Sequence, residues 1–464
     1  MSSFAEIDLE ILKKYNQPGP RYTSYPTAPL FSQDFTAGDF TAEIISTNSG
    51  AENAADLSLY FHFPFCESLC YFCGCNMMVS RDRRLISEYN ERLKKEIETL
   101  TPLISKNRKV SQMHWGGGTP SYLTPDEIRD VGEFIKSKFN FAPNIEASVE
   151  IDPRGLTFEH LKSFREIGFN RISLGVQDFN PQVQETINRI QPENITRQTV
   201  EWVRQLGFGS INLDLIYGLP FQTLRSFRQT VETVIDISPD RIAVFNYAHV
   251  PWLKKHQNIF KTETMPSPAE RLIILKQTIE QLVQNGYEYI GLDHFAKPTD
   301  ELAIAQKNNT LYRNFQGYST KAGCDVYAFG VSAISQFQNI YAQNLKNIKD
   351  YYARIETSEA AINVGYRMTF DDHVRKETIM QLMCHLQIDK RSIENRFGIS
   401  FEKYFADDIK KLDPFIVDGL LENNAERIFI KGAGKLIIRN VAMCFDAHLA
   451  EMAKEKKPVF SKTV

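Results

Sequence analysis

The chain has 464 residues, which is more than one compact core usually accommodates, so we expect a large domain and at least one smaller one. Its apolar content of 42% and charged content of 24% are typical of a globular protein, and its net charge of −3 excludes a bulk attraction to nucleic acid or anionic membranes. No apolar run is long enough for a membrane span, and residues 1–14 do not have the order of a signal peptide, so we expect a cytoplasmic protein.

The first 55 residues contain few periodic segments. Residues that break helices interrupt the middle of this stretch, at Pro18, Gly19, Pro20, Pro26 and Pro29. We therefore predict an N-terminal arm over residues 1–55, extended in its middle and with a short helix at each end.

From residue 57 onward, short apolar runs alternate with amphipathic helical patterns. Strands that alternate with helices form βαβ units, and right-handed crossovers curl such units, so we predict an α/β fold with a partial (β/α)6-type barrel over residues 56–365. The predicted strands are Leu57–Phe63, Val110–Trp115, Ile145–Ile151, Arg171–Val176, Ser210–Tyr217 and Arg241–Tyr247. The predicted helices are Ser87–Leu103, a helix opened by a capping box of Thr124 and Glu127, Phe158–Ile167, helical stretches up to Leu206, Ser226–Ile237 and Ala269–Asn285.

Polar and small side chains follow the ends of these strands. In a barrel of this kind, the loops after the carboxyl ends of the strands meet at one mouth, where the chemistry takes place. A loop rich in cysteine follows the first strand, and Gly116–Gly118 follow the second. The later strands bring Glu150, Asp152, Gln177, Asp178, Asp214, Asn246, Tyr247 and His249 to the same edge.

The composition changes near residue 365, and we predict a small C-terminal domain over residues 366–464 that is mostly helical and resembles a winged helix. Residues 371–464 hold 16 Lys and Arg against 15 Asp and Glu, so no basic excess supports DNA binding and a docking or lid role is favoured. The predicted elements are helices over Asp371–Leu386, Lys403–Leu412, Phe415–Leu421 and Ile438 to about Lys454, and a hairpin over Ala425–Ile438 that turns at residues 431–434.

Four of the seven cysteines lie within ten residues, in the pattern Cys66-x3-Cys70-x2-Cys73-x-Cys75. Three thiolates on one short loop can hold an iron–sulfur cluster, and three ligands on four irons leave one iron open for chemistry. A structural zinc site usually takes two ligand pairs that are separated by a longer interval, and no second pair lies nearby, so zinc is the weaker alternative. The isolated Cys324, Cys384 and Cys444 are interpreted as small buried hydrophobic residues.

The cysteine spacing, with Phe72 before the third cysteine, resembles the signature of the radical S-adenosylmethionine (SAM) superfamily. Longer stretches resemble the oxygen-independent coproporphyrinogen III oxidase family over nearly the whole chain. They are Pro18–Thr27, Tyr60–Asn76, Gln112–Pro120, Gly175–Phe179, Asp214–Pro220, Phe245–His249 and Asn314–Tyr318.

This resemblance implies the following roles. The ligands of a 4Fe-4S cluster are Cys66, Cys70 and Cys73, whereas Cys75 fits the family pattern without being a ligand. Two SAM molecules are bound, the first by Tyr60, Gly117, Glu150 and Ile334, and the second by Phe72, Gly118, Thr119, Gln177, Arg189, Asp214 and Ala248. A substrate with four propionates needs cationic or hydroxyl partners, for which the candidates are Arg21, Tyr22, Arg313 and Lys321.

The implied reaction is the oxidative decarboxylation of two propionates of coproporphyrinogen III to vinyl groups, through a 5′-deoxyadenosyl radical. It gives protoporphyrinogen IX in haem biosynthesis, and it implies a monomer with an unidentified electron donor and acceptor. A related haem chaperone is the nearest alternative, although the arm and the Cys73-Gly-Cys75 ending favour the oxidase. A zinc-binding, nucleic-acid-associated protein is a second alternative, which the charge balance disfavours.

Overall fold

The computed structural model describes residues 8–49, 54–452 and 460–463. Outside these ranges lie residues 1–7, which are half of the N-terminal segment without signal-peptide order. Lys454, where the last predicted helix would end, also lies outside them. Within them, no helix combines the length and the apolar character that a membrane crossing requires.

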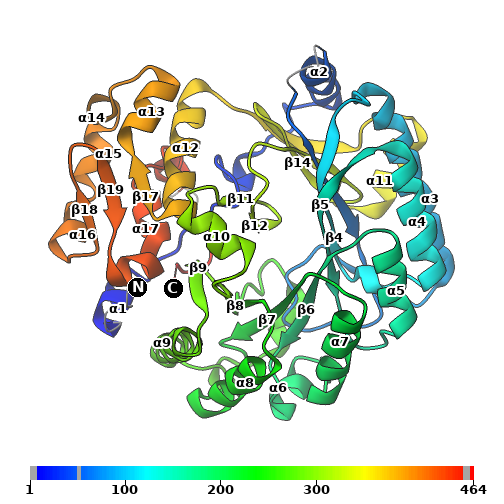
Figure 1. The fold of residues 1–464 in the computed structure, drawn as a ribbon, viewed down its shortest axis with the longest axis horizontal. Coiled ribbons are helices and arrows are strands. Elements are labelled where there is room, and N and C mark those ends of the chain that lie inside the picture. The colour runs from blue at the N-terminus through cyan, green and yellow to red at the C-terminus, as the bar shows by residue number, and fades with distance from the viewer. Residues whose placement is uncertain (1–7, 50–53, 453–459, 464) are drawn as a thin grey trace.

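A 12-stranded sheet forms the centre of the molecule, and helices lie along its outer side (Figure 1). Six of its strands are the predicted ones, so the predicted parallel barrel is confirmed. A seventh parallel strand, β13 (Asp325–Phe329), pairs with β1 and was not predicted. The six are β1 (Leu57–Phe63), β4 (Lys109–Gly117), β5 (Asn140–Ile151), β6 (Arg171–Gln177), β7 (Ser210–Tyr217) and β8 (Arg241–Asn246).

Alternation along the strands separates the apolar side of the sheet from the polar interior of the barrel. On β7, Leu213 and Leu215 are fully buried, whereas Asn212 and Asp214 point the other way and bond to each other and to β6. The helices that cover the outer side are α3 (Arg83–Leu100), α4 (Pro125–Lys138), α5 (Phe158–Glu166), α6 (Pro181–Thr186), α7 (Glu193–Gln205), α8 (Leu224–Ile237) and α9 (Pro268–Gln284).

The predicted capping box before α4 is confirmed. The backbone N–H of Glu127 donates to Thr124 Oγ1, and the N–H of Thr124 donates to Glu127 Oε2.

Antiparallel strands extend the sheet at both edges. They come from residues 288–367, where short strands without sustained alternation gave no signal. On one edge lie β10 (His294–Ala296) and β9 (Glu288–Gly291), and on the other β14 (Ile334–Gln336), β15 (Ile340–Asn344) and β16 (Ile362–Arg367). Between them in the chain lie α10 (Glu301–Lys307) and a separate hairpin of β11 (Tyr312–Asn314) and β12 (Gly317–Ser319), and α11 (Ile348–Glu356) precedes β16.

The N-terminal arm has a helix near each end, as predicted, with α1 over Leu9–Tyr15 and α2 over Ala37–Asn48. The ring of Tyr15 stacks on Phe415 of the C-terminal region with centroids 4.6 Å apart, and its hydroxyl donates to Asp418. At the other end, Glu43 of α2 forms an ion pair with Arg367 of β16. The arm therefore runs from the C-terminal region to the edge of the main sheet (Figure 1).

The C-terminal region combines short helices with a three-stranded sheet. Two details of the predicted hairpin are wrong. The hairpin turns at residues 424–426, where the Asn424 side chain accepts the N–H groups of Glu426 and Arg427, and residues 432–437 form a 3-10 helix instead of a turn. The elements are α12 (Phe370–His385), β17 (Gln387–Asp389), α13 (Lys390–Phe397), α14 (Phe401–Tyr404), α15 (Ala406–Lys410), α16 (Asp413–Val417), β18 (Leu421–Asn423) and β19 (Arg427–Ile430).

The helix predicted over Phe415–Leu421 ends at Val417, because Leu421 pairs with Ile430 in the sheet. The last predicted helix is also interrupted, and it forms α17 (Ile438–Met443) and α18 (Leu449–Met452). Between these two helices, Asp446 accepts hydrogen bonds from the His448 N–H and from Tyr22 of the arm.

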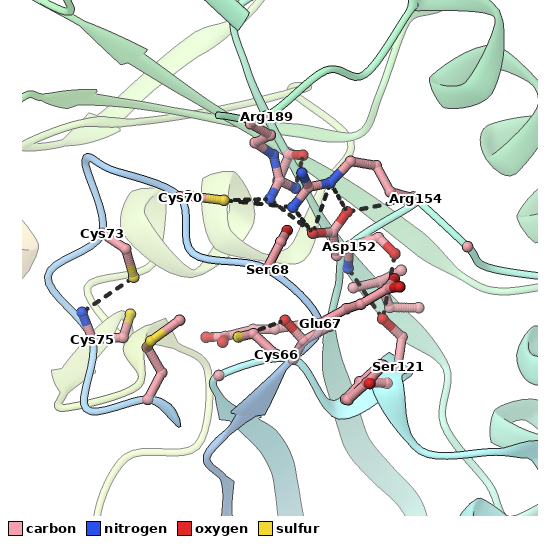
Figure 2. Close-up of a pocket in the computed structure, with 18 of the residues that line it drawn as sticks. Cys66, Glu67, Ser68, Cys70, Cys73, Cys75, Ser121, Asp152, Arg154 and Arg189 are labelled. Atoms are coloured by element: carbon pink, nitrogen blue, oxygen red, sulfur yellow. Dashed lines mark hydrogen bonds and ion pairs between the residues drawn. The ribbon is translucent and has the colours of Figure 1, made fainter. Parts of the chain in front are cut away.

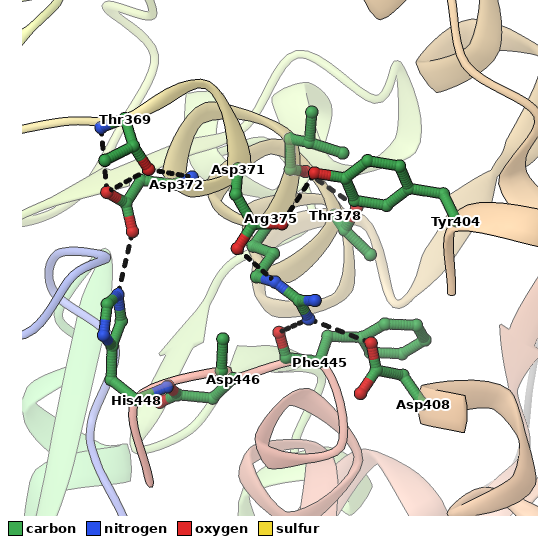
Figure 3. A network of polar contacts seen from close by, with 12 residues as sticks. Thr369, Asp371, Asp372, Arg375, Thr378, Tyr404, Asp408, Phe445, Asp446 and His448 are labelled. Atoms are coloured by element: carbon green, nitrogen blue, oxygen red, sulfur yellow. Dashed lines mark hydrogen bonds and ion pairs between the residues drawn. The ribbon is translucent and has the colours of Figure 1, made fainter. Parts of the chain in front are cut away.

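A polar network holds this interrupted segment against α12 (Figure 3). His448 Nε2 lies 2.8 Å from Asp372 Oδ1, and Arg375 bridges the Phe445 carbonyl to Asp408. Tyr404 donates to Asp371 at the same end of α12. The C-terminal segment, α12 and the arm are thus joined in one place.

Candidate functional site

The cysteine loop follows β1 and lines a cavity of about 640 Å³ at the carboxyl edge of the parallel strands. Its four cysteines lie on one side of this cavity, with Asp152, Arg154 and Arg189 facing Cys70 (Figure 2). The structure therefore brings the three predicted cluster ligands together. Of the isolated cysteines, Cys384 and Cys444 are buried as expected, whereas Cys324 is partly exposed.

The electrostatic surroundings of the four thiols differ. Burial raises the pKa of the Cys66 thiol to about 12, and its Sγ lies 3.1 Å from Thr119 Oγ1. A hydrogen bond from the Cys75 thiol lowers the pKa of Cys73 to about 6, and correspondingly raises that of Cys75. Cys70 Sγ accepts from Arg154 Nη2 at 3.5 Å and from Arg189 Nη1 at 3.6 Å. Two arginine side chains thus lie beside the buried end of the loop.

Side chains from other loops hold the cysteine loop by its backbone carbonyls. In the segment after β8, Lys254 donates to the Cys75 carbonyl at 2.8 Å, His256 Nε2 lies 2.8 Å from the Cys73 carbonyl and Gln257 donates to the Phe72 carbonyl at 2.9 Å. None of these three residues was predicted from the sequence. The only available signal was their position after the sixth strand.

In the described ranges, no three His, Cys, Asp or Glu side chains are close enough to share a single metal ion. A zinc ion would need its ligands at about 2.0–2.3 Å from one point. A cluster of several irons spreads its thiolates over a larger volume. The donor set, three thiols around an open cavity with cations beside them, suits such a cluster.

A second cavity of about 300 Å³ adjoins the first, since Cys75 and Glu150 line both. All four residues predicted for the first SAM line it: Tyr60, Gly117, Glu150 and Ile334. His62 on β1 and His114 on β4 also line this cavity and were not predicted as site residues.

Glu150 stays anionic at the junction of the two cavities. Burial acts to raise the pKa of its carboxyl, but His114 and the backbone N–H of Gly117 outweigh that effect and lower the pKa. Gly117 has a φ of +112°, and a Cβ added there would come within 2.6 Å of the His62 ring. Glycine is therefore needed at this turn for two independent reasons.

Six of the seven residues predicted for the second SAM line the larger cavity: Phe72, Gly118, Thr119, Gln177, Arg189 and Asp214. Arg189 is buried and donates to Asp152 Oδ2 at 2.9 Å and to the Gly175 carbonyl at 2.7 Å. Burial raises the pKa of Asp214 to about 6, although Ser173 and Asn212 donate to it. The seventh residue, Ala248, lies in the loop after β8 and is exposed, outside the lining of both cavities.

The four substrate candidates are dispersed. Arg21 forms an ion pair with Asp293, and its guanidinium lies 5.7 Å from the ring centroid of Phe245 at the end of β8. Tyr22 is only 1% exposed and donates to Asp446 at 2.9 Å, so it holds the arm to the C-terminal region.

Arg313 is 3% exposed and packs over the Tyr318 ring. The structure does not bring Lys321 to the mouth. The backbone N–H of Lys321 donates to Ser319, and Ser319 in turn accepts from Gln112 near the start of β4. The cysteine loop lies at the other end of the parallel strands, beyond their carboxyl ends.

Comparison with known proteins gives concordant matches. A model of the radical SAM superfamily matches residues 60–234, and a model described as the HemN C-terminal domain matches residues 368–437. The oxygen-independent coproporphyrinogen III oxidase of Escherichia coli is 44% identical over 457 residues, with 98% of each chain covered. That of Synechocystis is 42% identical over 463 residues, with 99% of this chain and 98% of the relative covered. The solved structure of the Escherichia coli coproporphyrinogen III oxidase, described as a radical SAM enzyme, superposes with a TM-score of 0.90 at 43% identity, covering 95% of this chain and 99% of that one.

Proposed function

The chain belongs to the family of oxygen-independent coproporphyrinogen III oxidases, radical SAM enzymes of haem biosynthesis, and we propose that it carries out that family's reaction. Two propionate side chains of coproporphyrinogen III are decarboxylated oxidatively to vinyl groups, and protoporphyrinogen IX is formed. The observation that carries the proposal is the pair of adjoining cavities at the carboxyl edge of the barrel, one lined by the three cysteines and both by Glu150.

We assign a 4Fe-4S cluster to Cys66, Cys70 and Cys73. Their common cavity and the two arginines beside Cys70 support this assignment. Held there, the cluster together with SAM would supply the one-electron chemistry of a radical SAM enzyme, which in this family proceeds through a 5′-deoxyadenosyl radical. Cys75 is assigned no iron, and its backbone N–H donates to Cys73 Sγ at 3.4 Å.

We assign one SAM to each cavity. In the smaller one, the Glu150 carboxylate can accept from an ammonium or ribose hydroxyl, and the turn at Gly117 lets the backbone approach the ligand. In the larger one, Arg189 can pair with a carboxylate and Asp214 can accept from a cation. The proposal of two molecules rests on two adjoining cavities, of which Glu150 lines both and Asp214 lines only the larger one.

Residues of the loop after β8 and of the arm exclude water from the reaction site. Lys254, His256 and Gln257 hold the cysteine loop, and the arm lies against the barrel end through Arg21 and Phe245. A radical intermediate needs that exclusion, because bulk solvent offers competing reactions.

We further propose a cytoplasmic monomer that takes its electron from an unidentified donor, passes electrons to an unidentified acceptor and has no nucleic-acid partner. All seven cysteines are free thiols, which fits a reducing compartment. The near-neutral balance of charge gives no attraction to nucleic acid.

The test is anaerobic turnover. The protein, with its cluster reconstituted, is incubated with dithionite, SAM and coproporphyrinogen III, and protoporphyrinogen IX is measured after oxidation to the fluorescent porphyrin. We expect product from the wild type and none from Cys70→Ser. A protein that holds an intact cluster, forms no product and binds haem tightly would favour the haem chaperone and overturn the proposal.

A further inference from the structure

Three arginines from distant parts of the chain meet beside the end of β8. Arg21 belongs to the arm, Arg313 to the β11–β12 hairpin and Arg439 to α17. Burial and the charges of Arg439 and Arg313 lower the pKa of Arg21 to about 9, so the three groups are close enough to repel one another. Of the three, only Arg21 has an ion-pair partner within the described residues, the carboxylate of Asp293.

Arg313 carries the clearest sign of a missing partner. The residue is only 3% exposed, yet its Nε and Nη1 have no hydrogen-bond partner among the described residues. Two buried guanidinium nitrogens without acceptors are costly, because they have lost their hydration and made no hydrogen bond in exchange. His294 Nδ1, beside it, also lacks a partner in the same part of the chain.

The surroundings of these groups are aromatic. The Arg313 guanidinium lies 4.7 Å from the centroid of Tyr318, and the ring of His294 is 5.3 Å from that of Tyr318 and 5.8 Å from that of Phe245. Rings of this kind offer apolar surface to a flat ligand that carries anionic groups.

The cluster also borders the reaction site. Phe245 is paired with Ile216, two residues after Asp214 on β7, so it lies at the carboxyl edge of the sheet. Two residues after Arg313, Phe315 lines the cavity that also contains Tyr60 and Glu150. A ligand held by Arg313 would therefore reach toward that cavity.

We propose that Arg21 and Arg313 together bind one carboxylate of the substrate, a propionate of the tetrapyrrole. This inference rests on the proposed function and assigns a binding site to it. Arg313 supplies the unpaired donors, and Arg21 exchanges its bond to Asp293 for one to the ligand. The bound carboxylate then adds a second negative charge, beside that of Asp293, to the group of three guanidinium groups.

Arg439 acts as a positioning residue in this arrangement. Its Nε donates to the Pro20 carbonyl at 2.9 Å, its Nη2 donates to the Gly19 carbonyl, and its Nη1 donates to the carbonyls of Lys462 and Thr463. These contacts fix the backbone directly before Arg21. The C-terminal region thus presents the arm's arginine to the site.

The experiment compares two probes on the anaerobically reconstituted full chain. Coproporphyrin III carries four carboxylates, and its tetramethyl ester has the same ring without the charges. Affinity is measured by quenching of porphyrin fluorescence. We expect Arg313→Gln and Arg21→Gln each to weaken binding of the acid by about tenfold or more, with little effect on the ester. Arg225→Gln, an exposed arginine on α8, is the matched control and leaves both affinities unchanged.

If both arginines bind the same carboxylate, their contributions to binding of the acid are coupled. The loss of affinity in the double variant should therefore be smaller than the sum of the losses, in free energy, of the two single variants. Arg439→Lys also weakens binding of the acid, and this effect disappears in the Arg21→Gln background, whereas a general loss of stability would persist there. Arg21→Gln tests the site alone if Arg313→Gln fails to fold, because Arg21 keeps 34% of its side chain exposed.

Single variants that bind the acid like the wild type, in a protein that still converts coproporphyrinogen III, overturn this inference and leave the proposed function intact. A wild type that neither binds the acid nor forms product overturns both.

Discussion

The backbone N–H of Gly117, at the end of β4, donates to Glu150 Oε2, at the end of β5, over 3.2 Å. This bond ties two neighbouring strands at the point where the two cavities adjoin. It also orients the Glu150 carboxylate at the smaller cavity, where Gly117 has no side chain that would obstruct a ligand. Substitutions at this junction of the cavities, and at the polar network that holds the C-terminal segment against α12, test the structure.

Replacing Glu150 by Gln should weaken SAM binding. The amide keeps an oxygen for the Gly117 N–H, so the fold is preserved, but the anion that would accept from an ammonium is lost. We expect the dissociation constant for SAM to rise by about tenfold or more, measured by equilibrium dialysis under anaerobic conditions. Glu98→Gln, a surface change on α3, is the control. Unchanged SAM affinity in Glu150→Gln would contradict the assignment.

Gly117→Ala should destabilise the protein more than Gly168→Ala. Both glycines have nearly the same positive φ, +112° and +107°, so both changes carry similar backbone strain. Only at Gly117 does the new Cβ meet another group, the His62 ring at 2.6 Å, whereas nothing lies within 4 Å at Gly168. We expect Gly117→Ala to cost at least about 1 kcal/mol more. Thermal unfolding of the two variants checks this, and equal melting temperatures would refute it.

The four cysteines should separate into two classes. Serine at position 66, 70 or 73 removes a proposed ligand, so the reconstituted protein should lose most of its iron and its brown colour. Cys75→Ser should keep both, because position 75 supplies no proposed ligand and its backbone N–H still donates to Cys73 Sγ. Iron and sulfide analysis with the absorption spectrum measures this. Loss of the cluster in Cys75→Ser would assign Cys75 as a ligand.

The contact between His448 and Asp372 should stabilise the protein within a pH window (Figure 3). The hydrogen bond to Asp372 raises the pKa of His448 above its usual 6.5, so its contribution is complete below 6.5 and is lost as the pH rises through the folded-state value. Asp372 is buried, which acts to raise its pKa, but the bonds from His448 and Thr369 outweigh burial and lower the pKa below 3.8. Its contribution is therefore present above 3.8 and lost as the pH falls further.

His448→Asn should accordingly lower the melting temperature most between pH 4 and pH 6.5. The difference from the wild type should shrink at higher pH. His373→Asn, at a partly buried histidine on α12 whose pKa is lowered by burial, is the comparison and should not show this pattern. A difference for His448→Asn that does not vary with pH would mean that the pair is not charged.

The sequence predicted the parallel barrel well, because the nearly continuous apolar run of Leu57–Phe63 and the alternating run of Ser210–Tyr217 are both separated from their neighbours by clear breaks. It missed β13, whose five residues have no amphipathic helix directly before them, and the edge strands, which are shorter still or lack a regular alternation. The glycines at 432 and 434 suggested a turn, but the chain turns earlier through the Asn424 side chain.

The site shows a similar division. Strand ends placed Glu150, Gln177 and Asp214 at one mouth from pattern alone. The grouping into two cavities depends on how loops from distant segments pack, and so does the contact of Arg21 with Phe245. Periodicity carries no information about such contacts. For the same reason Lys321 could be named as a substrate candidate although it lies near the start of β4, away from the cysteine loop.

The most direct test of the proposed function follows the hydrogen that the reaction removes. Coproporphyrinogen III carrying deuterium on the β-carbons of its propionates is incubated with the reconstituted protein, SAM and dithionite, and the 5′-deoxyadenosine formed is analysed by mass spectrometry. We predict that one deuterium enters each 5′-deoxyadenosine while labelled protoporphyrinogen IX accumulates. Unlabelled 5′-deoxyadenosine, formed without porphyrin product, would contradict the assignment of this substrate to the site.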